Sequence, residues 1–245
     1  QFYVLTITPI LILLLMFMTI TPLVGWTKGS FSQAFIKIKY SLIFSLTLAF
    51  AISLYFSLFP VTQIIILFLS FSLIATSLFL GVNLYKKNIF VKSILGRTLS
   101  HAGFGLFIVS VIANATYSEE KIYDAKVKDI LELNEHQFVF EKVNRVEGEN
   151  YSSIQAVFNL LRDDKPINRF TPEIRFYNDP PTATSETSIV QGVFKDIYIV
   201  MNVPQYQDSI SVRIHIKPFM NFIWLGVLMI IIGGIFSIFQ RVKSA

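Results

Sequence analysis

One histidine lies in a stretch of sequence that otherwise carries no charge. His101 belongs to the segment LSHAGFG, and no Asp, Glu, Lys or Arg occurs from Thr98 to Thr116. A neutral imidazole in such a segment can hydrogen-bond a neighbouring helix or a water, or it can bind a metal ion. Ionisable side chains inside membrane spans are costly and tend to mark function. His101 is therefore the first candidate for chemistry in the apolar part of the chain.

Two glycines follow this histidine at short spacing. Gly103 and Gly105 leave the helix surface without side chains beside the imidazole. A bare surface lets a flat macrocycle such as haem approach, and imidazole is a common axial ligand of haem iron. Glycines in membrane spans also serve ordinary helix packing. Both interpretations of Gly103 and Gly105 stay open on the sequence alone.

The other candidate groups indicate less chemistry. The chain has three histidines and no cysteine, which excludes disulfides and thiolate sites and makes a zinc site a poor fit. His215 alternates onto the polar side of a predicted strand, where we expect it to be solvated, and His136 is typical of a turn or strand edge. The adjacent acid pairs are typical of solvated loops, namely Asp163 with Asp164 and Glu119 with Glu120.

The composition is that of a membrane protein. The mean hydropathy is +0.58, 53% of the residues are hydrophobic, and 24 are Phe. A soluble domain of this composition would expose too much apolar area. No short apolar core with a small-residue cleavage site marks a signal peptide. Because the chain opens on Gln1, we expect its start to be a fragment boundary.

Five segments are apolar and long enough to cross a bilayer, which takes roughly 20 residues. The first runs over Val4–Leu23. No acid or base occurs between Tyr40 and Tyr85, which leaves room for two spans separated at the proline of FPVTQ, 59–63. The fourth covers Thr98–Thr116 and the fifth Pro218–Gln240.

Charge sets the orientation of these spans. Basic residues follow the first, third and fifth spans, and none of these loops holds an acid, so the positive-inside rule places all three on the cytoplasmic side. The formal net charge of +5 therefore reflects topology, and nucleic-acid binding is not needed to explain it. The basic residues concerned are Lys28, Lys37, Lys39, Lys86, Lys87, Lys92, Arg97, Arg241 and Lys243.

The segment between the fourth and fifth spans is predicted to form an external domain. It holds all 16 Asp and Glu residues of the chain. Isoleucine and valine alternate with polar residues over 210–217, which is typical of a half-buried strand, and four further stretches favour strands: HQFVFEKV, IQAVFNLL, EIRFY and DIYIVMNV. The predicted fold is thus an all-α bundle of five transmembrane helices with a mainly antiparallel β domain, a small sandwich or barrel, inserted between the fourth and fifth. We expect the bundle's first four spans over 1–116, the external domain over 117–217, and the fifth helix with a basic cytoplasmic tail over 218–245.

Several motifs, in their order and spacing, resemble one known family. They are ITPLVGW at 20–26, SHAGFG at 100–105, PEIRFY at 172–177, SETSI at 185–189, Gly192 followed by DIYI, and KPFMNFIWLGVLMIIIGG at 217–234. From about Thr19 onward the chain resembles the C-terminal part of the CcmF family of cytochrome c haem lyases, which are haem handling proteins.

The resemblance implies a cofactor, a reaction and partners. The histidine that matches His101 is in that family one of two axial ligands of a haem b within the bundle, which is thought to pass electrons from quinol to the delivered haem. Gly103 and Gly105 would then give clearance for the haem face. The family takes haem from the haem chaperone CcmE and joins it to apocytochrome c, whose thiols the subunit CcmH reduces. It acts on the outer face of the bacterial or mitochondrial inner membrane, on the periplasmic or intermembrane-space side.

The chain also departs from the family pattern. The family's outer haem-binding motif needs several tryptophans, whereas this chain has only Trp26 and Trp224. The second haem b ligand has no candidate here and is expected from other polypeptide. We therefore expect part of a haem lyase complex, a fragment or a separately encoded subunit, with no catalytic residues of its own and no activity alone. The alternative is a non-catalytic membrane scaffold or permease-like component whose external domain binds a partner. In PEIRFY, Glu173 and Arg175 share a strand face and could pair, whereas a docking role is the other interpretation.

Overall fold

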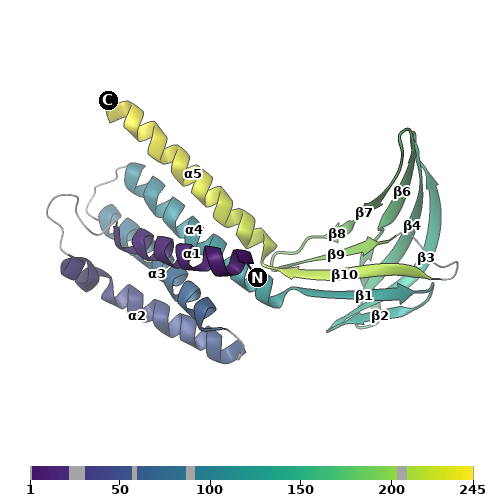
Figure 1. The fold of residues 1–245 in the computed structure, drawn as a ribbon, viewed down its shortest axis with the longest axis horizontal. Coiled ribbons are helices and arrows are strands. Elements are labelled where there is room, and N and C mark those ends of the chain that lie inside the picture. The colour runs from purple at the N-terminus through teal and green to yellow at the C-terminus, as the bar shows by residue number, and fades with distance from the viewer. Residues whose placement is uncertain (1, 22–30, 57–59, 87–91, 203–208, 245) are drawn as a thin grey trace. The chain divides into compact units, whose positions relative to one another are not determined.

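The protein is described here from a computed structural model, over residues 2–21, 31–56, 60–86, 92–202 and 209–244 (Figure 1). The chain divides into two compact units. One comprises Gln1–Ala113 with Asn221–Ala245, and the other comprises Asn114–Met220. The first unit is helical and the second is built of strands, and each is described by itself.

Five helices make up the first unit: α1 (Phe2–Ile20), α2 (Phe31–Phe56), α3 (Val61–Lys86), α4 (Lys92–Tyr117) and α5 (Met220–Ser244). Four of them contain stretches long and apolar enough to cross a membrane, at Ile38–Tyr55, Val61–Val82, Leu95–Tyr117 and Met220–Phe239. In α1 the apolar stretch Leu5–Ile20 is shorter. The predicted end of the first span at Leu23 lies outside the described residues, so a fifth span stays a prediction.

Proline starts α3 as the sequence predicts. Pro60 precedes the first helical residue, and its carbonyl accepts hydrogen bonds from the backbone N–H groups of Gln63 and Ile64 at 2.9 and 3.3 Å. Proline has no N–H to donate, which costs nothing before the first helical turn, where that N–H would have no partner within the helix.

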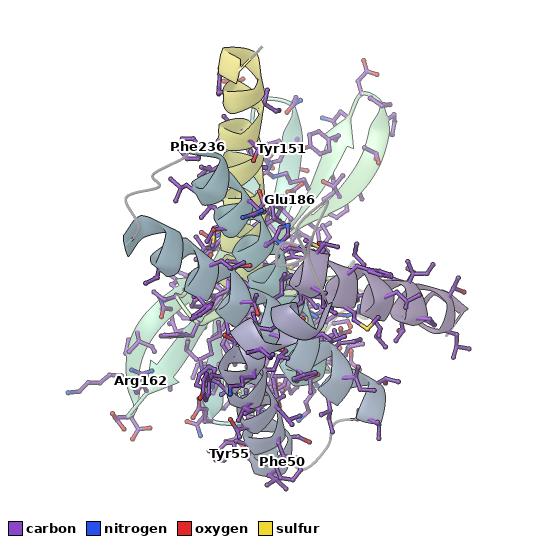
Figure 2. All side chains as sticks on the ribbon, turned by 90° about the vertical axis from the view of Figure 1, so that its left-hand side faces the viewer. Phe50, Tyr55, Tyr151, Arg162, Glu186 and Phe236 are labelled. Carbon is purple, nitrogen blue, oxygen red and sulfur yellow. The ribbon has the colours of Figure 1, made fainter. Side chains whose placement is uncertain are left out.

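The bundle has a small apolar core and a large apolar surface. Leu15, Ile66, Leu73 and Ile108 form a buried cluster from α1, α3 and α4. Side chains such as Phe50 and Tyr55 of α2 point away from the other helices and are exposed (Figure 2). Such an apolar surface suits a lipid environment, because the acyl chains form no hydrogen bonds and the helices satisfy their own backbone groups.

The second unit is a sandwich of two antiparallel sheets. One sheet has the order β1-β10-β9-β8, and the other has the order β2-β3-β4-β6-β7, with β5 paired to β4. The strands are β1 (Glu119–Ala125), β2 (Ile130–Leu133), β3 (His136–Glu147), β4 (Tyr151–Arg162), β5 (Lys165–Phe170), β6 (Glu173–Asn178), β7 (Pro181–Glu186), β8 (Ser188–Val190), β9 (Lys195–Met201) and β10 (Ile210–Pro218). The predicted antiparallel β domain is confirmed.

Both sheets contribute to one hydrophobic core. The ring of Phe140 stacks on that of Phe158 at 4.5 Å between centroids, and Phe138 meets Phe170 edge-on at 5.9 Å. From the other sheet Ile199, Val212 and Ile214 are fully buried in the same cluster. Because the period-two alternation of β10 places every second residue here, the sequence pattern and the core agree.

Candidate functional site

His101 lies on α4 and faces the interior of the bundle. Its imidazole hydrogen-bonds the backbone of Met18 in α1. Since the backbone carbonyl can only accept, a ring N–H is the donor, which leaves the other ring nitrogen of the neutral imidazole with its lone pair. A histidine that donates one N–H to a carbonyl is the usual arrangement of a metal-bound histidine, because that bond fixes the tautomer and the ring orientation.

A very small cavity lies beside the imidazole. Its volume is about 10 Å³, and α1, α3 and α4 line it. Its polar lining residues besides His101 are Thr19, Thr76, Ser77, Arg97 and Thr98. A cavity of this size holds no more than one water.

These dimensions test whether His101 fits the haem that the family resemblance implies. The donor chemistry fits, because one nitrogen is held by Met18 and the other is free to bind iron. The cavity does not hold a macrocycle, since pockets for ligands of that size run to about 300–1,000 Å³. His101 is only partly buried. A porphyrin bound to His101 would therefore lie outside this cavity.

The glycines after His101 lie in close helix contacts. A Cβ on Gly103 would come within 2.6 Å of Met229 Cβ in α5, and one on Gly105 would come within 2.6 Å of Ile74 Cγ1 in α3. Both distances are shorter than real side chains allow. The interpretation of Gly103 and Gly105 as clearance for a haem face is therefore wrong for this arrangement, because neighbouring helices occupy the space above both residues. Their packing role, the alternative left open by the sequence, accounts for them.

The predicted solvation of His215 is wrong. Its side chain is 11% exposed, and its ring stacks on Tyr198 at 4.5 Å between centroids. Its Nδ1 lies 3.3 Å from Glu120 Oε2. Burial lowers the pKa of His215, and the Glu120 carboxylate opposes this shift. His215 and Tyr198 are direct partners across β10 and β9, and this register places one ring over the other.

His136 is the first residue of β3, which agrees with its predicted position in a turn or at a strand edge. Its side chain is 11% exposed, and burial together with the charge of Lys195 lowers its pKa. Glu135 Oε1 lies 3.8 Å from His136 Nδ1 and 2.9 Å from Lys195 Nζ. The pair of Glu135 with Lys195 holds the pKa of that carboxyl below its usual range.

The predicted pairing within PEIRFY is confirmed. Arg175 Nε donates a hydrogen bond of 2.7 Å to Glu173 Oε1, and Ser153 Oγ donates one of 2.9 Å to Glu173 Oε2. The guanidinium of Arg175 lies 4.6 Å from the ring centroid of Tyr151. Bonding to Tyr177 and Glu173 raises the pKa of Arg175. The motif thus forms a satisfied network on one face of the sheet.

Sequence reasoning missed the partners of these groups. The Met18 carbonyl, which orients His101, carries no side-chain signal, because any residue can present a carbonyl. The hydroxyl residues Thr19, Thr76 and Ser77 leave only a weak signal, since α1 and α3 also carry other Ser and Thr residues. In the part of the chain that the structure describes, no group of three His, Cys, Asp or Glu side chains is placed to hold a metal ion.

Comparison with known proteins finds a family match for the outer domain. Residues 116–218 match the family model described as the CcmF C-terminal β-sandwich. Over 145 residues the chain is 30% identical to the cytochrome c-type biogenesis protein CcmF of Escherichia coli, which covers 59% of this chain and 22% of the relative. The match to CcmF of Pseudomonas aeruginosa is 29% identical over 150 residues and covers 61% of this chain and 23% of the relative.

Two further matches extend over nearly the whole chain. CcmF of Haemophilus influenzae is 26% identical over 251 residues, covering 98% of this chain and 38% of the relative. A solved structure titled cytochrome c heme lyase CcmF has the same fold, with a TM-score of 0.75 at 15% identity, over 96% of this chain and 40% of that one. The chain thus spans well under half the length of the proteins that it matches.

Proposed function

We propose that the chain is a C-terminal portion of a CcmF protein and that it contributes an axial ligand, His101, to a haem b of a cytochrome c haem lyase, which its similarity to CcmF proteins supports. The second axial ligand comes from polypeptide outside this chain. When bound, such a haem supplies one-electron transfer. The chain works as part of the haem lyase complex and has no ligation activity alone.

The orientation of His101 is the observation that carries this proposal. The ring donates to the Met18 carbonyl, keeps one nitrogen lone pair for iron, and lies partly exposed in an apolar bundle. An ionisable side chain inside an apolar bundle is costly and tends to mark a functional site, which supports a ligand for His101. The hydrogen bond to the Met18 carbonyl orients the ring and leaves its other nitrogen for a ligand.

The second element of the proposal is the location of the outer domain. The four apolar helices and the similarity to CcmF indicate a multi-pass membrane protein. We place it in a bacterial or mitochondrial inner membrane with five spans, and the domain over 117–217 on the periplasmic or intermembrane-space side. There the domain would meet the rest of the haem lyase, the chaperone CcmE, apocytochrome c and the thiol-reducing subunit CcmH.

The test is the visible spectrum of the intact protein, purified in detergent with its complex. The reduced wild-type protein should show a b-type haem, and His101→Ala should lose it, because one of two axial ligands is gone. His136→Ala is the matched control, since His136 lies in the outer domain, and it should retain the haem.

The result that contradicts the proposal is a His101→Ala variant that folds and keeps its haem spectrum unchanged. In that case the alternative is a membrane scaffold whose external domain binds a partner. A permease-like pathway has less support, because the cavity beside His101 holds no more than one water.

A further inference from the structure

The turn between β8 and β9 exposes two large apolar side chains that are adjacent in the chain. Val193 is 70% exposed and Phe194 is 65% exposed. Single apolar residues on a protein surface are ordinary, whereas contiguous apolar surface marks a site of interaction. Other turns of the sandwich carry charged or amide side chains instead, namely Asn134 with Glu135, Glu149 with Asn150, and Asp163 with Asp164. The β8–β9 turn is therefore a candidate contact surface of the outer domain.

The backbone of this turn is held from within the sandwich. The N–H of Gly192 donates a hydrogen bond of 3.1 Å to Asp196 Oδ1, and Asp196 is buried. A Cβ on Gly192 would come within 2.5 Å of the Lys195 carbonyl oxygen, which is closer than a real side chain allows. The turn is thus tight and fixed, so Val193 and Phe194 are presented to a partner without the entropy cost of ordering a loop.

The same turn is bonded to the residue that precedes α5. The N–H of Phe219 donates a hydrogen bond of 2.7 Å to the Phe194 carbonyl oxygen. Met220 follows directly and begins both α5 and its apolar stretch, Met220–Phe239. The turn, Phe219 and Met220 all belong to the unit Asn114–Met220, so their closeness is a property of that unit alone.

This bond fixes the level of the turn in a bilayer that α5 crosses. A span begins where the hydrocarbon meets the headgroups, and the headgroup region on each side is about 5–7 Å thick. Phe219 is one residue from the start of the apolar stretch, which is about 3.8 Å between Cα atoms, and its N–H is bonded to Phe194. The backbone of the turn therefore falls within the headgroup region whatever the tilt of α5.

We propose that Val193 and Phe194 insert into the interfacial region of the lipid bilayer, so that the outer domain contacts the membrane at this turn as well as through its two helices. Apolar side chains at the boundary of headgroups and acyl chains gain by leaving water. Neither residue carries a charge that would oppose this transfer. The proposal rests on α5 crossing the membrane, as proposed above, and does not depend on the haem ligand.

The experiment places a fluorophore that senses its environment at one engineered cysteine, because the natural chain has none. The intact purified protein is reconstituted into phosphatidylcholine vesicles whose lipids carry a nitroxide quencher either close to the headgroup or near the end of the acyl chain. The probe at Val193→Cys should emit further to the blue than a probe in water, and the shallow quencher should reduce its emission more than the deep one. Adding Phe194→Ser should weaken both effects, because the turn loses its larger apolar side chain. Ile130→Ser removes an exposed apolar side chain from β2 and should change neither.

Glu149→Cys is the matched control for the position of the probe. The strand β3 starts at His136, next to Glu135, whose carboxylate pairs with Lys195 directly after the β8–β9 turn, and it ends at Glu147. A strand of 12 residues spans about 35–40 Å. The probe at Glu149 therefore lies far from the β8–β9 turn within the sandwich, and neither quencher should reach it.

A probe at Leu228→Cys, an exposed position of α5, separates failure of the proposal from failure of its premise. If lipid quenches the probe at Leu228 and not the one at Val193, the span holds and the contact at the turn is overturned. If lipid quenches neither, α5 is not in the bilayer and the proposal falls with its premise. A blue-shifted Val193 probe that no lipid quenches would also overturn it, since a protein partner would then cover the turn. Thermal unfolding of each labelled variant checks the fold, which the exposed Val193 position should leave unchanged.

Discussion

Glu173 is a buried carboxylate whose partners come from two neighbouring strands. Its two oxygens accept hydrogen bonds from Arg175 on β6 and from Ser153 on β4, and the residue is 8% exposed. A buried carboxylate is tolerated only when such donors satisfy it. The network therefore stabilises the pairing of β4 with β6 because these donors are in place.

Removing the serine hydroxyl should weaken this pairing. Ser153→Ala deletes a hydrogen bond to a charged group, which contributes about 2 kcal/mol to the free energy of unfolding. Hydrogen exchange of the β4 and β6 backbone amides in the intact protein measures the change. Ser152→Ala, the adjacent position on the other face of the strand, is the control and should change little. Equal effects of the two substitutions would show that the Glu173 network does not stabilise the sheet.

The buried histidines of the outer domain predict a dependence on pH. Burial lowers the folded-state pKa of His136 and of His215. The unfolded chain, with an imidazole pKa of about 6.5, then binds protons that the folded domain does not. The free energy of unfolding is therefore highest above about pH 6.5, where the rings are neutral in both states. It decreases as the pH falls from that value toward the lower folded-state pKa.

The measurement compares unfolding of wild type and His215→Gln between about pH 7.5 and 5.0, on either side of the unfolded pKa. The wild type should lose more stability than the variant over this interval, because the variant lacks one of the protonating groups. A larger loss in the variant would mean that the Glu120 carboxylate, which favours the protonated ring, outweighs burial.

At this scale the sequence predicts partners that are close along the chain and fails for those across strands. Glu173 and Arg175 are two apart on one strand, so their common face follows from the period of two. The burial of His215 depends on Tyr198 lying opposite it, and the register of β9 against β10 is not written in either segment alone. His101 was identified because a titratable residue is conspicuous in an apolar run. The clearance role of Gly103 and Gly105 failed because a bare helix face attracts a helix as well as a macrocycle.

At the scale of the elements, α4 and α5 pack closely against each other at positions occupied by glycine. A Cβ on Gly103 would approach Met229 Cβ to 2.6 Å and the Gly226 carbonyl oxygen to 2.8 Å. On α5 a Cβ on Gly226 would in turn come within 2.8 Å of the Gly103 carbonyl. The backbones of the two helices therefore touch directly, which is a common way for helices to associate in lipid.

Gly103→Ala should separate these two helices. The added methyl group has no space, so α4 and α5 must shift, at a cost of about 1–3 kcal/mol. The expected result is a lower melting temperature of the purified protein. Gly234→Ala is the matched control, because a Cβ there meets no atom within 4 Å, and it should be neutral or slightly stabilising. Equal melting temperatures of the two variants would contradict the close contact.

The predicted elements divide by how strongly their patterns repeat. The alternating segment 210–217 is found as β10, and the stretches with regular apolar positions are found as β3, β4, β6 and β9. The sequence does not predict β1, β2, β5, β7 and β8 individually. In β7 the residues are small and polar and most are exposed, so no apolar period marks the strand. Such strands form because a neighbouring strand supplies hydrogen bonds, and a local pattern cannot report that.

For the whole molecule, the charge distribution predicts which side of the membrane each loop occupies. The acidic residues all lie between α4 and α5, whereas the loops after the first and third spans are basic. This separation agrees with a multi-pass membrane protein and predicts that the sandwich is outside.

Single-cysteine labelling tests this topology directly, because the natural chain has no cysteine. Glu149→Cys lies in the turn between β3 and β4, and we expect an impermeant maleimide added to intact cells to label it. Lys92→Cys lies at the start of α4, and we expect label there only after the membrane is permeabilised. The reverse pattern would invert the orientation, and labelling of both positions in intact cells would contradict the assigned spans.

The pairing of β1 with β10 has a mechanical consequence. These are the strands that continue into the chain's two connections, through Ser118 to α4 and through Phe219 to α5, and they pair from Glu119 with Ile216 through Ala125 with Ile210. Both connections leave the same end of this ladder, next to the pair of Glu119 with Ile216, so separating β1 from β10 at that end would break their backbone hydrogen bonds one after another. The ladder therefore keeps the start of β1 and the end of β10 side by side, and the last residues before α5 stay next to the first residues after α4 only while this pairing is intact.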